Sequence, residues 1–150
     1  MELANVIRKA KRVYLIGNGG SAANAIHIAN DLIACGIKAH ALTADVATLT
    51  AIANDYSYEE IFARQLECLV DADDLLLALS GSGRSRNICR ALQMAKRKGA
   101  STFAIVGAFN TEMPAEMLAD YCIKVGQDMQ EAEERQLSLG HEAMRCLKNS

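Results

Sequence analysis

Short apolar runs alternate with longer amphipathic segments along the whole chain. The runs that have the length of β-strands are Val13–Ile16, Ala39–Leu42, Leu75–Leu79, Thr102–Val106 and Tyr121–Val125. The segments with helical periodicity are clearest over Ser21–Ala34, Tyr58–Leu69, Asn87–Lys98 and Glu131–Lys148. Strands that alternate with helices are typical of a parallel sheet, and near-continuous apolar strands are typical of a sheet covered on both faces. The pattern predicts an α/β fold, a three-layer α/β/α sandwich around a five-stranded parallel sheet.

The composition narrows the class of protein without changing this picture. The 150 residues have the length of one domain, 51% of them are hydrophobic, and the formal net charge is -2. This charge argues against a protein that binds nucleic acid through a basic surface. No apolar run approaches the roughly 18 residues of a membrane helix and no signal peptide is evident, so we expect a cytoplasmic domain. The five cysteines contain no C-x-x-C pair, which favours buried, reduced thiols over a zinc ribbon or a disulfide framework.

Two loops that follow predicted strands are unusually rich in glycine and serine. The first, called the glycine loop below, is Gly17-Asn18-Gly19-Gly20-Ser21. The second, called the serine loop, is Ser80-Gly81-Ser82-Gly83-Arg84-Ser85-Arg86-Asn87. In parallel sheets, ligands bind beyond the carboxyl ends of the strands. Glycines let the backbone approach a ligand closely there, and the free amides at a helix start favour an anion. The hydroxyls and amides of the second loop suit a phosphate monoester.

Helix capping and nucleotide binding account for these loops less well than phosphate binding does. A single serine could cap a helix, but capping does not explain Ser80, Ser82 and Ser85 together. No Walker pattern G-x-x-x-x-G-K-[ST] is present in the sequence. The first loop matches the dinucleotide pattern G-x-G-x-x-A, yet the acidic residue expected at the end of the second strand is missing, because Asp45 comes late. We therefore expect a phosphate site and no nucleotide cofactor.

A polar stripe crosses the helix that follows the first loop. Asn24, His27 and Asp31 are three and four residues apart and share one helix face. A solvated face would carry Lys, Arg and Glu, whereas Asp31 is the only charged residue between Val13 and Ile37. Alone, His27 would be interpreted as a core histidine. With Asp31 one turn further on, the pair fits either a metal chelate or an acid–base pair.

The C-terminal helix carries a second candidate group. Leu137, His141 and Met144 share one face, so His141 points where the apolar residues point. Gly140 lies in the helix interior, where glycine costs about 1 kcal/mol relative to alanine. Such a cost is tolerable where something must approach the helix closely. Three glutamates, Glu133 among them, crowd the start of this helix, where acidic residues also suit the helix dipole.

Together these motifs resemble the phosphoheptose isomerases, a family with the sugar isomerase (SIS) fold, which is flavodoxin-like. The likeness is carried by Gly17–Ala23 with His27, by Ala47–Tyr56 and by the serine loop. It covers nearly the whole chain and implies a homotetramer with active sites at subunit interfaces. It further implies that residues 1–150 form one SIS domain that lacks the longer N-terminal helical segment usual in the family.

The resemblance also implies roles for individual residues. The substrate would contact Asn18, Gly19, Gly20, Ser21, Asn54, Asp55 and Glu133, and its phosphate would lie on Ser80, Gly81, Ser82 and Ser85. One zinc ion per subunit would be held by His27, Asp31, Glu133 and His141. Asp31 and His141 would form the catalytic acid–base pair. Asp31 and Glu133 stand where the family has glutamate and glutamine, and Gly81 where it has threonine.

The implied reaction is an aldose–ketose isomerisation of sedoheptulose 7-phosphate to glycero-manno-heptose 7-phosphate through an enediol. The product would feed heptose synthesis for surface lipopolysaccharide. Two alternatives stay open: a non-catalytic SIS domain that binds a sugar phosphate or a protein partner such as a replication initiator, and an isomerase for another sugar phosphate. The implied partners are a phosphorylated sugar and further copies of the chain, with no nucleic acid and no membrane.

The spacing of two implied zinc ligands raises a question of geometry. Glu133 and His141 would be separated by about 12 Å along one continuous helix, which is long for two ligands of one ion. Either the helix begins after Glu133, or a neighbouring subunit supplies part of the site. The apolar face around His141 favours a homo-oligomer.

Overall fold

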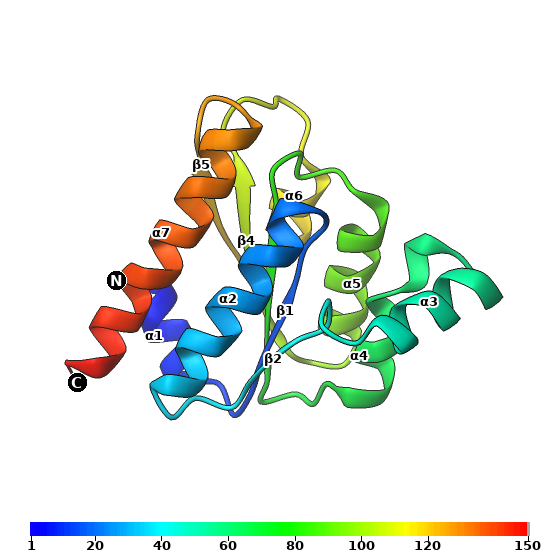
Figure 1. Ribbon diagram of the computed structural model, residues 1–150, viewed down its shortest axis with the longest axis horizontal. Helices are drawn as coiled ribbons and strands as arrows, with labels where there is room; N and C mark the ends of the chain where they lie inside the picture. The colour runs from blue at the N-terminus through cyan, green and yellow to red at the C-terminus, as the bar shows by residue number, and fades with distance from the viewer. Residues whose placement is uncertain (150) are drawn as a thin grey trace.

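A fully parallel sheet runs through the middle of the molecule, and helices cover both of its faces (Figure 1). The computed structural model describes residues 1–149. The strands are β1 (Val13–Ile16), β2 (Ala39–Ala41), β3 (Leu75–Ser80), β4 (Ser101–Gly107) and β5 (Tyr121–Val125). They lie in the order β2-β1-β3-β4-β5. The predicted α/β fold with five parallel strands is therefore confirmed.

The helices form two layers. One face of the sheet is covered by α1 (Glu2–Lys9), α2 (Gly20–Ala34) and α7 (Met129–Lys148). The other face is covered by α4 (Ala63–Leu69), α5 (Arg86–Arg97) and α6 (Pro114–Leu118). Helix α3 (Val46–Asp55) lies at the outer edge of the molecule and has no buried residue. Within residues 1–149, no helix is long and apolar enough to cross a membrane.

Side chains of the central strands alternate between two separate cores. In β3, Leu75, Leu77 and Leu79 pack under α1, α2 and α7, while Leu76 and Ala78 pack under α4, α5 and α6. All of these side chains are fully buried. A strand with both faces buried has no position that favours a polar residue, which is why the sequence shows continuous apolar runs.

The segment expected to form one helix over Tyr58–Leu69 is divided. A 3₁₀ turn, η1 (Tyr58–Glu60), precedes α4, and the consecutive side chains of Ile61 and Phe62 are both buried between them. The turn is held against α5 by ion pairs from Glu59 to Arg86 and from Glu60 to Arg90. These tertiary contacts override the local helical periodicity.

Three helices, α1, α3 and α6, were not expected from the periodicity. Helix α1 packs its apolar face on the sheet, and α3 begins at Asp45, whose side chain accepts a hydrogen bond of 3.2 Å from the Thr48 amide. Asp45 is an N-cap residue with a good sequence signature. The periodicity alone did not reveal α3, because none of its residues is fully buried and only the half-buried Leu49, Ile52 and Ala53 pack against the core.

The cysteines form no disulfide among residues 1–149. Cys68 is exposed and the others are half-buried, so the expectation of buried thiols is met only in part. Burial raises the pKa of the Cys89 thiol and raises the pKa of Cys122 to about 11. These two thiols are therefore protonated and unreactive near neutral pH.

Candidate active site

Two loops meet where the strand order reverses. The chain leaves β1 for one side of the sheet and β3 for the other, and β1 and β3 are hydrogen-bonded neighbours. Ligands bind at such a switch point, outside the carboxyl ends of the strands. A cavity of about 80 Å³ lies between the loops and the start of α7; its lining residues are Asn18, Ser21, Leu79, Ser80, Gly81, Ser82, Ser85, Met129 and Glu133.

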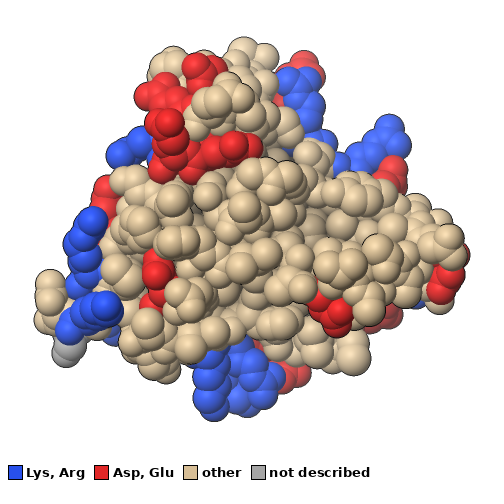
Figure 2. All heavy atoms as spheres, in the orientation of Figure 1, with Lys and Arg blue, Asp and Glu red and all other residues tan. Residues whose placement is uncertain are grey.

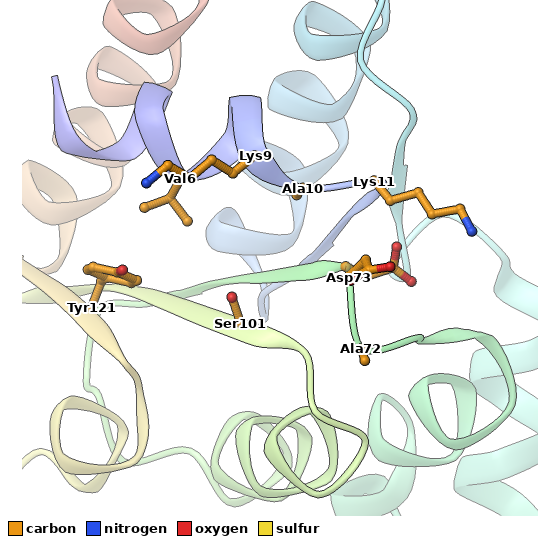
Figure 3. Close-up of a pocket in the computed structure, with 9 residues that line it drawn as sticks. Val6, Lys9, Ala10, Lys11, Ala72, Asp73, Ser101 and Tyr121 are labelled. Carbon is orange, nitrogen blue, oxygen red and sulfur yellow. The ribbon is translucent and has the colours of Figure 1, made fainter.

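A larger hollow, of about 540 Å³, lies at the opposite edge of the sheet, where the strands begin (Figure 3). Lys9 and Lys11 line it, but their side chains extend in opposite directions and do not converge on one anion. The carboxyl end of the sheet therefore remains the better candidate for a phosphate site.

The serine loop is folded around its own hydroxyls. The Gly83 amide donates to Ser80 Oγ at 3.1 Å, the Arg84 amide donates to Ser82 Oγ at 3.3 Å, and the Oγ atoms of Ser82 and Ser85 are 3.4 Å apart. Ser85 is the N-cap residue of α5, yet its side chain makes no capping hydrogen bond. Helix capping therefore does not account for Ser85, and its hydroxyl is available to a ligand.

The glycine loop is shaped mainly by its protein neighbours. Gly19 has φ +55°, in the left-handed region that favours glycine. A Cβ at Gly20 would lie 2.4 Å from Glu133 Oε2, so glycine at this position leaves room for the carboxylate. Glu133 thereby places a carboxylate at the N-terminus of α2, where the helix dipole favours negative charge.

A compact group of two histidines and one aspartate lies between α2 and α7. The Nε2 atoms of His27 and His141 are 3.1 Å apart, and Asp31 Oδ2 lies 3.4 Å from the first and 3.3 Å from the second. Asp31 Oδ2 is buried and has no hydrogen bond of good geometry. Three atoms that could each bind a metal thus face one another, and one of them, Asp31 Oδ2, has no hydrogen-bond partner.

The dimensions of this group fit a metal ion. Tetrahedral bonds of about 2.0–2.1 Å to nitrogen and oxygen place the ligand atoms about 3.3–3.4 Å apart. The observed separations are 3.1, 3.3 and 3.4 Å. Glu133 does not join the group, since the cluster of metal-ligating atoms among residues 1–149 contains only His27, Asp31 and His141. Three protein ligands with an open fourth position are typical of a catalytic rather than a structural site.

Comparison with known proteins identifies the family of the chain. Residues 2–107 match the SIS domain. A phosphoheptose isomerase of Aneurinibacillus thermoaerophilus is 40% identical over 143 residues, which cover 91% of this chain and 71% of that protein. This chain belongs to the phosphoheptose isomerase family.

Solved structures of the phosphoheptose isomerase family share the fold. The enzyme from Francisella tularensis superposes with a TM-score of 0.91 at 26% identity, over 99% of this chain and 84% of that one. The enzyme from Neisseria gonorrhoeae superposes with a TM-score of 0.86 at 28% identity, over 99% and 82%. The resemblance drawn from the sequence motifs is therefore confirmed.

Helices α2 and α7 carry all three members of the cluster and are held together by polar and apolar contacts. Asn24 Nδ2 donates to the Glu133 carbonyl at 2.8 Å and to Gln136 Oε1 at 3.1 Å. Ser21 Oγ also donates to Gln136 Oε1, at 3.1 Å. Gln136 is fully buried. It was not identified from the sequence, because an amide in a run of charged residues gives no sign of burial.

Gly140 is the point of closest approach between the two helices. A Cβ at this position would lie 2.6 Å from Cγ1 of Ile28, a buried residue of α2. The sequence indicated that something must approach Gly140 closely, and α2 is that element.

The structure does not bring every expected site residue together. Asn54 and Asp55 lie exposed at the end of α3, where Asn54 Nδ2 donates to Asp55 Oδ1 at 3.0 Å, and neither lines the serine-loop cavity. Helix α7 is continuous through Glu133 and His141, so the idea that the helix begins after Glu133 is wrong. Glu133 is a neighbour of the phosphate loop in this chain and not of the histidines.

Replacing Gly140 with alanine tests the helix contact. Overpacking against Ile28 should cost about 1–3 kcal/mol, partly offset by about 1 kcal/mol from the better helix propensity of alanine. The added methyl group should also move His141 away from α2 and weaken metal binding. Urea unfolding and zinc titration measure both effects, with the exposed Glu134→Ala as control. A variant as stable as the parent with unchanged zinc affinity would contradict the contact.

Proposed function

We propose that this protein is a sugar-phosphate isomerase that converts sedoheptulose 7-phosphate to glycero-manno-heptose 7-phosphate. The observation that carries the proposal is the His27–Asp31–His141 cluster on the same two helices that close the serine-loop cavity. A place for phosphate and a place for proton chemistry are therefore built on the same pair of helices, α2 and α7. We propose that it acts in the cytoplasm, as a single SIS domain.

The separation of the two places favours a long sugar. Ser21 lines the phosphate cavity and precedes His27 by about 9 Å along α2, while Glu133 precedes His141 by about 12 Å along α7. An extended seven-carbon sugar with a phosphate on its last carbon is of comparable length. With its phosphate on Ser80, Ser82 and Ser85, such a sugar would bring its first two carbons to the histidines.

The isomerisation moves one carbon-bound proton. A base removes the proton from carbon 1 of the open-chain ketose while an acid protonates oxygen 2, giving an enediol, and a proton is then returned to carbon 2 while the oxygen-bound proton leaves oxygen 1. We assign this transfer to Asp31 and His141, which belong to the same cluster. Asn18, Gly19 and Gly20 would hold the hydroxyls of the sugar chain.

His27, Asp31 and His141 would hold a zinc ion. When bound, zinc supplies a Lewis acid that polarises the carbonyl oxygen. Because Asp31 Oδ2 and both Nε2 atoms face the ion position, the groups left for proton transfer are the second carboxylate oxygen of Asp31 and Nδ1 of His141.

We further propose a homo-oligomer, a tetramer by family likeness, in which a second subunit completes the site. The exposed apolar residues Ile26 and Ile33 lie on the outer face of α2, with 45% and 59% of their surface accessible. Figure 2 shows that charged side chains gather over the start of α7 and are sparse over the face around α2. The exposed pair Asn54 and Asp55 would then reach the site of a neighbouring copy.

The phosphate assignment is tested at the serine loop. Ser82→Ala and Ser85→Ala each remove a donor to a charged acceptor, so each should weaken binding of the sugar phosphate by about 1.5–3 kcal/mol. Glu133→Gln removes a negative charge from the same cavity, so it should strengthen binding of the sugar phosphate. Calorimetry measures all three, with the distant Ser101→Ala as control. Unchanged affinity in both serine variants would refute the assignment.

Asp31→Asn tests the chemistry. The amide has nearly the same shape but cannot accept the proton and is a poor metal ligand, so turnover should be lost and zinc content should fall while the fold is kept. Rates and metal analysis measure this, with the exposed Asp73→Asn as control. A near-normal kcat would show that Asp31 is not needed for the reaction. Full activity after chelation would show that the metal is not needed.

Mixed oligomers test where each residue acts. Asp31 and His141 meet within one chain, so mixing Asp31→Asn with His141→Ala should not restore activity. Mixing Asp31→Asn with Asp55→Asn should restore part of it, if Asp55 serves the neighbouring site. Subunit exchange is verified by mass spectrometry. A fully active monomer by light scattering would rule out the shared site.

A further inference from the structure

A buried asparagine ties the two loops of the site together. Asn87 lies in the first turn of α5, directly after the serine loop, and is 3% exposed. Its Nδ2 donates to Asn18 Oδ1 at 2.8 Å, and its Oδ1 accepts from Asn18 Nδ2 at 2.9 Å. Tyr58, from η1, donates its hydroxyl to the same Asn18 Oδ1 at 2.8 Å. Two reciprocal amide bonds and one phenol bond thus converge on the glycine loop.

These bonds occupy the side chain of Asn18. A carbonyl oxygen has two lone pairs, and both of those on Asn18 Oδ1 are already taken, by Asn87 and by Tyr58. One of the two amide hydrogens is also used. We therefore expect Asn18 to contact a substrate mainly through its backbone. Its carboxamide links the glycine loop to the start of α5.

The Asn18–Asn87 pair lies beyond the last hydrogen-bonded residues of the two strands. Pairing of β1 with β3 ends at Ile16 and Ala78, before either loop begins. Beyond that point, the Asn18–Asn87 pair is a direct side-chain link from the glycine loop to the segment that carries Ser82 and Ser85. Because the link is buried, breaking it would leave both amide groups without partners and away from water. That cost in free energy is what keeps the two loops together.

We propose that Asn87 is a positioning residue, which sets the distance between the phosphate-holding serine loop and the glycine loop along the sugar chain. The inference rests on the proposed function, because it concerns how that site holds both the phosphate and the hydroxyls of a sugar phosphate. A ligand held by the serine loop alone, such as inorganic phosphate, does not depend on the distance. A sugar phosphate, which spans both loops, does.

Comparison of the two ligands provides the test. Asn87→Leu removes both amide bonds at similar volume, and Gln93→Leu makes the same exchange at an exposed position of α5. For Asn87→Leu we expect sedoheptulose 7-phosphate to bind at least about tenfold more weakly and inorganic phosphate to change by less than about twofold. Tyr58→Phe keeps the amide pair and should show a smaller change in the same direction. Gln93→Leu should bind both ligands as the parent does.

Each other outcome overturns the inference. If both ligands weaken equally, Asn87 acts on the serine loop alone; if neither weakens, it serves only the fold. Should Asn87→Leu fail to fold, unaltered discrimination between the ligands in Tyr58→Phe would overturn the proposal. Failure of the proposed function is seen separately, as a parent protein that binds the sugar phosphate without turning it over.

Discussion

The close packing of α2 against α7 is the constraint on which the rest of the site depends. His27 and Asp31 belong to α2 and His141 to α7, so their 3.1–3.4 Å separations exist only while the helices keep one distance and one register. Gly140 sets the distance, because any side chain there would collide with Ile28. Gln136 sets the register, since its buried oxygen accepts from both Ser21 and Asn24. A buried polar contact of this kind discourages any shift along the helix axis, because a shift would leave its groups unpaired.

The parallel sheet supplies the other half of the site. Its switch point brings the loops after β1 and β3 together, and both following helices start without a side-chain cap. One uncapped start, that of α2, is occupied by Glu133. The other, that of α5, is left to the serines. The protein thus satisfies one helix dipole internally, and the second would be satisfied by a phosphate in the proposed site.

The sequence predicted those parts of the molecule that follow from local patterning. The central strands were predictable because a doubly covered sheet favours apolar residues on both faces, and the two loops because glycine and serine are conspicuous at strand ends. The partner of Glu133 was not predictable, since helical spacing gives its distance from His141 but does not show which loop it faces. Asn87 and Gln136 escaped notice for a related reason. Their partners lie 69 and 115 residues away in the chain, and only the folded structure brings these amides together.

The charges around the phosphate cavity affect how tightly it would bind a phosphate group. Among residues 1–149, no Lys or Arg lines this cavity, and Arg84 of the serine loop turns to Asn110, whose Oδ1 accepts from it at 3.0 Å. Phosphate would therefore be held by hydroxyls and amides beside a carboxylate. Hydrogen bonds to neutral donors give less affinity than a buried ion pair, and Glu133 reduces it further. Modest binding of the ground state is no disadvantage to an isomerase, because binding energy accelerates the reaction only where it is stronger in the transition state. In the proposed site the phosphate end would orient the sugar, and the groups that could act on the transition state lie at the His27–Asp31–His141 end, where the enediol would form.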